Sequence, residues 1–123
     1  MKRGVVILTA LSVACWIGLT VVLLTPASGL PQTPTGDKVN HLIGFGMLVC
    51  ITTLAVWGHR PGWSFAGYWV MAIALGYSCL TEYLQTLPMI NRSGEFADVL
   101  ANGCGCAVGA IVAAAVRWVL GRS

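Results

Sequence analysis

The amino-terminal stretch of the chain limits its fold most strongly. A cationic end, Met1-Lys2-Arg3, precedes an apolar run from Gly4 to Thr25. As an α-helix this run would be about 33 Å long, which matches the hydrocarbon core of a bilayer. A secretory signal peptide has an apolar region of only about 7 to 15 residues, so a transmembrane helix is the better interpretation. The whole chain agrees, since 57% of its residues are hydrophobic and 9% are charged.

Three further apolar stretches follow, separated by segments that interrupt helices. The segment 26–36 contains three prolines, the turn 58–62 combines glycine and proline, and Pro88 stops the third stretch. In hydrocarbon each backbone polar group must be satisfied inside its own helix. We therefore predict a single all-α domain over residues 1–123, an integral membrane bundle of four transmembrane helices. The predicted helices span about 4–25, 40–57, 64–87 and 97–120.

The distribution of charge predicts the orientation of the bundle. With four spans, both termini and the turn 58–62 share one side. The lysines and arginines on that side are Lys2, Arg3, Arg60, Arg117 and Arg122, against Lys38 and Arg92 on the other. The positive-inside rule therefore predicts that both termini are cytoplasmic. All four acidic residues then fall at or near the outer face, and no basic patch of the kind that binds nucleic acid is present.

Polar residues recur at helical spacing near the predicted outer ends of three helices. Residues at i, i+4 and i+7 share one face of a helix. Three such stripes are Asp37, His41 and Gly44; Ser78, Glu82 and Gln85; and Asp98, Asn102, Gly105 and Gly109. Small residues spaced like Gly105 and Gly109 let a neighbouring helix approach closely. We therefore expect the stripes to converge on a polar pocket between helices.

Glu82 is the most informative residue of these stripes. A carboxylate inside a bilayer costs about 2.5 to 3.5 kcal/mol at the helix centre and less near an interface, so it is retained when it is paired, hydrated or functional. A purely structural role, such as a salt bridge to Lys38 or Arg92, is one interpretation. A functional pocket is the other, in which His41 beside carboxylates carries protons. The five cysteines are scattered through apolar stretches and are interpreted as small buried hydrophobes.

The order and spacing of these polar motifs resemble the VanZ-like family of small bacterial membrane proteins. The motifs are Asp37-Lys-x-x-His41, Glu82-x-x-Gln85, Arg92 and Asp98-x-x-x-Asn102-x-x-Gly105-x-x-x-Gly109. The likeness covers about residues 37–109, and Leu42 replaces the aromatic residue that often follows the histidine. The resemblance implies a multi-pass protein of the bacterial inner membrane and cell envelope, associated with resistance to teicoplanin-type glycopeptides or with surface polysaccharides. It implies no established reaction.

Three hypotheses for function follow from these residues. In the first, the pocket binds or processes a phosphate-bearing lipid, such as a lipid-linked envelope precursor, at the outer leaflet. Catalytic roles then fall to Glu82, His41 and Asp98, and substrate-binding roles to Asp37, Lys38, Gln85, Arg92 and Asn102. The oxygen ligands would suit a divalent cation such as Mg²⁺, and Arg92 could hold phosphate oxygens in a bidentate manner.

The second hypothesis is a non-catalytic envelope protein that alters surface accessibility, in which the polar residues only hold the fold. The third is a small proton-coupled transporter with Glu82 and His41 as a relay. It ranks last because every acid on the predicted route lies in the outer half. Membrane lipids are the expected partners in each case. The oligomeric state, the metal and the existence of a reaction stay open.

Overall fold

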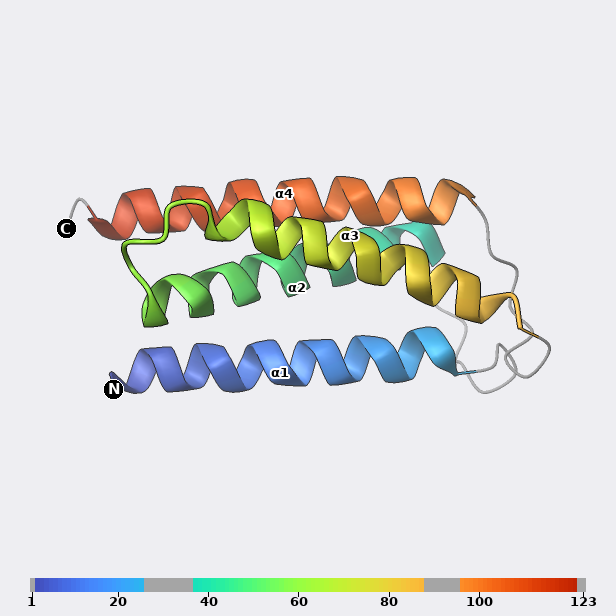
Figure 1. Ribbon diagram of the computed structural model, residues 1–123, viewed down its shortest axis with the longest axis horizontal. Helices are drawn as coiled ribbons and strands as arrows, with labels where there is room; N and C mark the ends of the chain where they lie inside the picture. The colour runs from blue at the N-terminus through green and yellow to red at the C-terminus, as the bar shows by residue number, and fades with distance from the viewer. Residues whose placement is uncertain (1, 26–36, 88–95, 122–123) are drawn as a thin grey trace.

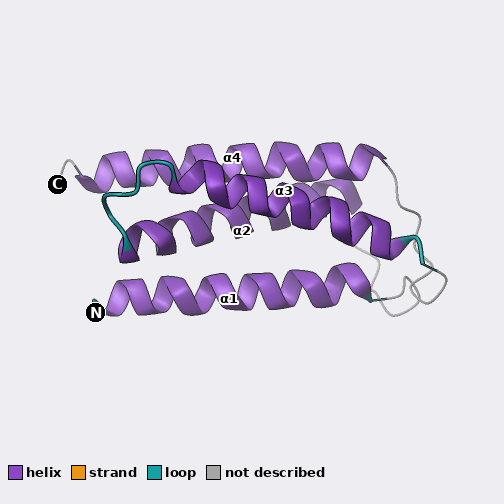
Figure 2. Ribbon diagram, in the orientation of Figure 1, coloured by secondary structure: helices purple, strands orange, loops and turns teal. Residues whose placement is uncertain are grey.

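The computed structural model describes residues 2–25, 37–87 and 96–121. Four α-helices account for most of this part of the chain: α1 (Arg3–Leu24), α2 (Asp37–His59), α3 (Ala66–Gln85) and α4 (Phe96–Gly121). They lie alongside one another (Figure 1), and the described ranges contain no strand (Figure 2). The predicted all-α fold with four helices is confirmed.

The helix bounds differ from the predicted ones mainly at α2 and α3. Helix α2 begins at Asp37 rather than at 40 and continues to His59. Helix α3 is shorter than predicted at both ends, because the residues just before and just after it form tight turns instead of regular helix. The Trp63 amide donates to the Arg60 carbonyl in the preceding turn, and the Thr86 and Leu87 amides donate three residues back. Hydrogen bonds of this kind tighten the end of a helix into a 3₁₀-like turn.

Three of the helices are long and apolar enough to cross a membrane: Arg3–Leu24, Val39–His59 and Asp98–Gly121. Helix α3 is not among them, although its 20 residues correspond to about 30 Å. Its apolar character is reduced by polar residues that the bundle buries, including Ser78, Thr81, Glu82 and Gln85. The predicted fourth span rests on the position of α3 alongside the other helices (Figure 1).

The closest packing in the bundle joins α2 to α4, which have the most extensive contact of any helix pair. A Cβ atom on Gly105 would overlap the Leu42 carbonyl oxygen, and one on Gly109 would overlap the Gly46 carbonyl oxygen. The predicted close approach at Gly105 and Gly109 is thus confirmed. Gly44, however, faces Leu19 of α1, so Gly46 is the glycine of α2 that packs against α4. We call the contacts of Gly105 and Gly109 with Leu42 and Gly46 the glycine seam.

Helix α1 is attached to the bundle by hydroxyl groups as well as by apolar side chains that pack against the core. Ser12 Oγ and Thr52 Oγ1 share a hydrogen bond of 2.8 Å, and Trp16 Nε1 donates to the same Thr52 oxygen at 3.1 Å. Thr20 Oγ1 and the Tyr77 hydroxyl are 2.6 Å apart. Only two residues of α1, Ser12 and Leu23, are fully buried. Most of α1 therefore presents an apolar surface suited to lipid.

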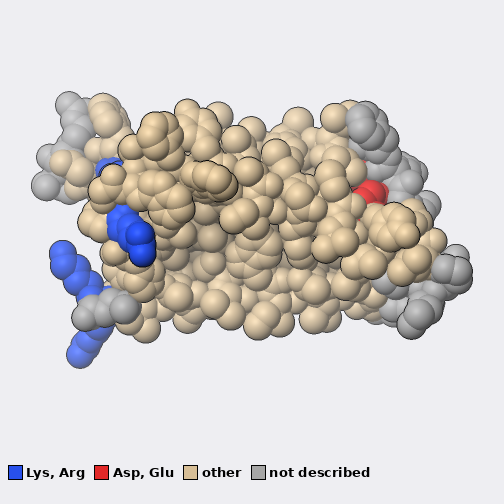
Figure 3. Space-filling view, in the orientation of Figure 1, with Lys and Arg blue, Asp and Glu red and all other residues tan. Residues whose placement is uncertain are grey.

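The charges of the described residues are sorted between the two ends of the bundle. The N-terminus, the C-terminus and the α2–α3 turn lie at one end (Figure 1), and the lysine and arginine side chains visible in Figure 3 lie there. The carboxylate seen in the same view lies at the opposite end. This separation agrees with the predicted charge distribution along the chain.

Candidate functional site

Polar side chains from three helices are buried together at the end of the bundle opposite the termini. Ionisable groups are rarely buried this deeply unless they are paired: the exposed fraction is 4% for His41, 9% for Glu82 and 5% for Asp98. Asn102 of α4 and Ser78 of α3 are almost completely buried beside them. We call these five residues the polar cluster. They point into the bundle rather than onto separate outer faces.

A hydrogen-bonded chain runs across the polar cluster. His41 Nδ1 on α2 lies 2.9 Å from Asn102 Oδ1 on α4, and Asn102 Nδ2 donates to Ser78 Oγ on α3 at 2.7 Å. One amide side chain therefore joins three helices. This geometry depends on the glycine seam, because Leu42 follows His41 directly and Gly105 lies one turn beyond Asn102. The close approach of α2 to α4 brings the imidazole within reach of the amide.

The orientation of the Asn102 amide fixes the tautomer of His41. Because Nδ2 of Asn102 donates to Ser78, its Oδ1 must accept from His41, and Nδ1 of the imidazole therefore carries the hydrogen. In the neutral ring the lone pair is then on Nε2. A histidine held in one tautomer by a partner on its other nitrogen is arranged as a general base or acid.

The two carboxylates lie on the side of the hydrogen-bonded chain that is farther from the termini. Glu82 is one turn beyond Ser78 on the same face of α3, and Asp98 is one turn before Asn102 on α4. Since α3 runs away from the end that carries the termini and α4 runs back toward it, both carboxylates are farther from the termini than the amide is (Figure 1). Both take part in interactions with other residues, so neither is an isolated buried charge.

Gln85 lies outside the polar cluster and bonds to helix α1 instead. Its Nε2 donates to the Leu23 carbonyl oxygen at 2.8 Å, and its side chain is 2% exposed. The last carbonyls of a helix lack partners within that helix. Gln85 thus satisfies one of these carbonyls and ties the end of α1 to α3. Its predicted contact with a substrate stays a prediction.

Several predicted site residues lie beyond what the structure describes. Asp37 and Lys38 belong to α2, but their side chains are outside the described part, and Arg92 is outside it altogether. Within the described residues, no group of three or more His, Cys, Asp or Glu side chains could hold a metal ion. Asn102 Oδ1 is already bonded to His41. A divalent cation held by Glu82 and Asp98 would therefore need ligands from elsewhere.

Ser78 was not predicted as a site residue. Its position one turn before Glu82 places it on the polar face of α3, and this spacing is visible in the sequence. A serine in a transmembrane helix is common, however, and often bonds only within its own helix. What identifies Ser78 as part of the cluster is the Asn102 amide, a contact between segments 24 residues apart.

Comparison with known proteins gives one family. The family model described as VanZ/LLP1 matches residues 6–117, which is nearly the whole chain. No match was found among curated proteins or among solved structures. The match includes α2 and α3, most of α1 and α4, and the complete polar cluster. The chain therefore belongs to the VanZ/LLP1 family.

Proposed function

We propose that this VanZ-like membrane protein of the bacterial envelope binds a phosphate-bearing lipid at the outer leaflet and acts on it by acid–base chemistry. One observation carries the proposal: three ionisable side chains, from three helices, are buried at the same end of the bundle, where His41 belongs to the His41–Asn102–Ser78 chain. Buried ionisable groups inside a membrane bundle mark functional sites by default. An oriented imidazole and two carboxylates are the side chains that proton transfer requires.

The proposed chemistry assigns a role to each group. Nε2 of His41 accepts the proton of an oxygen nucleophile, either water or a lipid hydroxyl, as that oxygen attacks phosphorus. The bond from phosphorus to the leaving oxygen breaks, and Glu82 or Asp98 in its acid form protonates that oxygen. Lys38 and Arg92 hold the phosphate oxygens, with Arg92 suited to a bidentate contact. The lipid tail remains in the bilayer beside the helices. An altered envelope lipid is consistent with a role in teicoplanin-type resistance.

The proposal includes an orientation in the inner membrane. Basic residues gather at the end that carries both termini (Figure 3), which favours the cytoplasmic side for that end. The polar cluster then lies in the outer half. Alkaline phosphatase fused after Gly62 or after Gly121 is expected to be inactive in cells, because the enzyme folds only outside the cytoplasm. An active fusion at either position would contradict the orientation.

The experiment measures lipid turnover by the purified protein in vesicles that contain polyprenyl phosphate or polyprenyl diphosphate. Glu82→Gln and His41→Gln are expected to reduce turnover by about 10²-fold or more, the usual contribution of a general acid or base. Tyr83→Phe is the matched control, because Tyr83 neighbours Glu82 in sequence and is 66% exposed. Repeating the assay with a chelator tests for a divalent cation. Full activity of both cluster variants would refute catalysis by these groups.

A non-catalytic role is a second candidate, and the hydrogen bonds of the polar cluster favour it. The chain through Asn102 connects α2, α3 and α4, and Gln85 connects α3 to α1. If these bonds serve only stability, Glu82→Gln should lower the abundance of folded protein in proportion to any loss of resistance. A folded, abundant and inactive variant would contradict this second candidate and support the first.

A further inference from the structure

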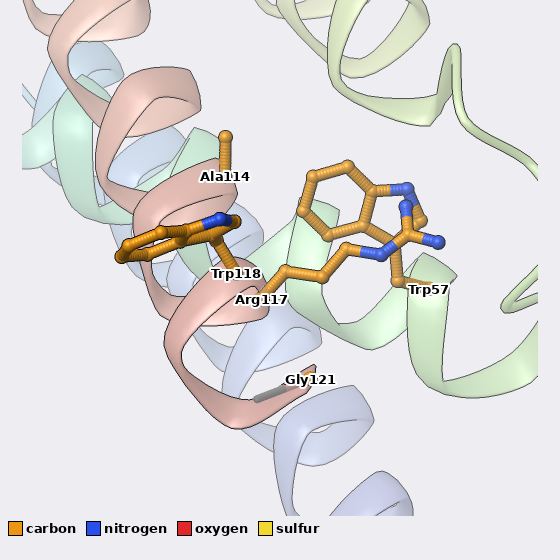
Figure 4. A pocket seen from close by; sticks show the side chains of 5 residues that line it. All are labelled: Trp57, Ala114, Arg117, Trp118 and Gly121. Carbon is orange, nitrogen blue, oxygen red and sulfur yellow. The ribbon is translucent and has the colours of Figure 1, made fainter. Parts of the chain in front are cut away.

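A second concave site lies at the opposite end of the bundle from the polar cluster. It is an open groove of about 440 Å³ between the ends of α2 and α4. Its walls are mostly apolar, and Arg117 is the charged residue among them. Figure 4 shows the Arg117 side chain reaching from α4 toward Trp57 of α2, with Trp118 on the other side of α4. The lining residues are Trp57, Ala114, Arg117, Trp118 and Gly121.

Two contacts hold the Arg117 guanidinium at the mouth of this groove. Its Cζ atom lies 4.5 Å from the centre of the Trp57 ring, a cation–π contact, and Nη2 donates to the Pro61 carbonyl in the α2–α3 turn. Trp57 is fixed in turn by its own hydrogen bond from Nε1 to the Trp63 carbonyl at 2.8 Å. A guanidinium has five N–H donors, and the bond to Pro61 uses one of them. The group is thus positioned in advance for an anion.

The surroundings of the groove combine positive charge with exposed apolar surface. Lys2, Arg3 and Arg60 occupy the same end as Arg117, and the described residues of this end include no acidic side chain. Trp118 is 63% exposed and Leu120 is 65% exposed. Tryptophan and arginine at the end of a membrane helix are located at the level of lipid headgroups. A phospholipid whose phosphate lies near Arg117 would thus place its acyl chains against the apolar wall of the groove.

We propose that this groove binds an anionic phospholipid, with its phosphate on Arg117 and one acyl chain along Ala114 and Trp118. A guanidinium suits this role because it binds phosphate in a bidentate manner. A second copy of the chain is a poorer occupant, since a parallel neighbour would place the same cations against this end. The inference concerns a different end of the bundle and is independent of the chemistry proposed for the polar cluster.

The experiment counts lipids that stay bound to the purified protein, by native mass spectrometry across a titration with phosphatidylglycerol or phosphatidylcholine. We expect phosphatidylglycerol to bind in preference, and Arg117→Gln to weaken its binding about tenfold, as expected for the loss of a charge-assisted bidentate contact. Arg60→Gln is the matched control, because it removes the same charge at the same end outside the groove. It should leave the affinity within about twofold of the original value.

Two more variants separate a defined site from general charge attraction. Ala114→Trp fills the groove without a change of charge and should weaken phosphatidylglycerol binding. Ala114 is exposed, so the larger side chain does not disturb the core. Arg117→Lys keeps the charge and the fold but loses the bidentate contact, so it should bind with intermediate affinity. Equal binding of the two lipids, or equal losses in Arg60→Gln and Arg117→Gln, would overturn the proposal. Displacement of the lipid by inorganic phosphate alone would assign the site to a free anion and also overturn it.

Discussion

The glycine seam makes a strong prediction for a single added methyl group. In Gly105→Ala the new Cβ would overlap the Leu42 carbonyl oxygen and lie 3.1 Å from the Leu42 Cα atom. Carbon atoms in favourable contact are about 3.5 to 4.0 Å apart, so α2 and α4 must separate by roughly 0.5 to 1 Å. The atoms in the way belong to the Leu42 backbone, which cannot rotate away as a flexible side chain could. Overpacking of this kind costs about 1 to 3 kcal/mol.

Gly103→Ala is the matched control on the same helix. Its Cβ would meet only the Leu75 Cδ2 atom at 3.6 Å, an ordinary contact. Alanine also has a higher helix propensity than glycine by up to about 1 kcal/mol. We therefore expect Gly103→Ala to be neutral or stabilising. Because both variants gain the same helix propensity, Gly105→Ala should be less stable than Gly103→Ala by the overpacking cost alone, about 1 to 3 kcal/mol.

Unfolding in mixed micelles of mild detergent and sodium dodecyl sulfate, followed by tryptophan fluorescence and far-UV circular dichroism, measures this difference. The same separation of helices should lengthen the contact between His41 and Asn102, so Gly105→Ala should also lose any activity that the polar cluster supports. Equal stability of the two alanine variants would refute the reasoning, because it would mean that α2 and α4 are not held together at backbone distance.

Four other changes test the hydrogen bonds of the bundle in the same unfolding assay. Thr52→Val removes the hydroxyl that joins α1 to α2 and should lower the free energy of unfolding by about 1 kcal/mol. Thr53→Val should be neutral or stabilising, because no described residue bonds to the buried Thr53 hydroxyl. The opposite ranking of these two variants would contradict both assignments. Gln85→Leu should cost about 1 kcal/mol and loosen the end of α1, seen as faster proteolysis there. Asn102→Leu breaks two hydrogen bonds and should cost about 1 to 3 kcal/mol; unchanged stability would exclude the amide as a link between helices.

Much of the fold follows from patterns within single segments. Apolar length, proline and glycine breaks and helical spacing predict four helices and the face on which Glu82 or Asp98 lies, because all of these are properties of neighbouring residues. The close approach at Gly105 and Gly109 was predictable for the same reason. The helix ends were less predictable, since hydrogen bonds in the turns on either side of α3 decide where its regular structure starts and stops.

Contacts between segments were not predictable to the same degree. Periodicity places Gly44 on the same face as His41, but the rotation of α2 in the bundle is set by packing on both α1 and α4, and it turns Gly46 toward α4 instead. Likewise, no local pattern shows that Gln85 bonds to the end of α1 or that Ser78 bonds to Asn102. These partners depend on how three helices pack, which a single sequence does not contain.

The way in which α1 is attached affects how this protein should be handled. Its hydroxyl contacts with α2 and α3 face no competition in hydrocarbon, where water is scarce. A small detergent micelle admits water, which can replace a hydroxyl partner at little cost. Extraction should therefore release α1 before the other three helices, and hydrogen–deuterium exchange on bilayer-embedded and solubilised samples should differ first in that segment. Measurements on the polar cluster are accordingly best done in nanodiscs.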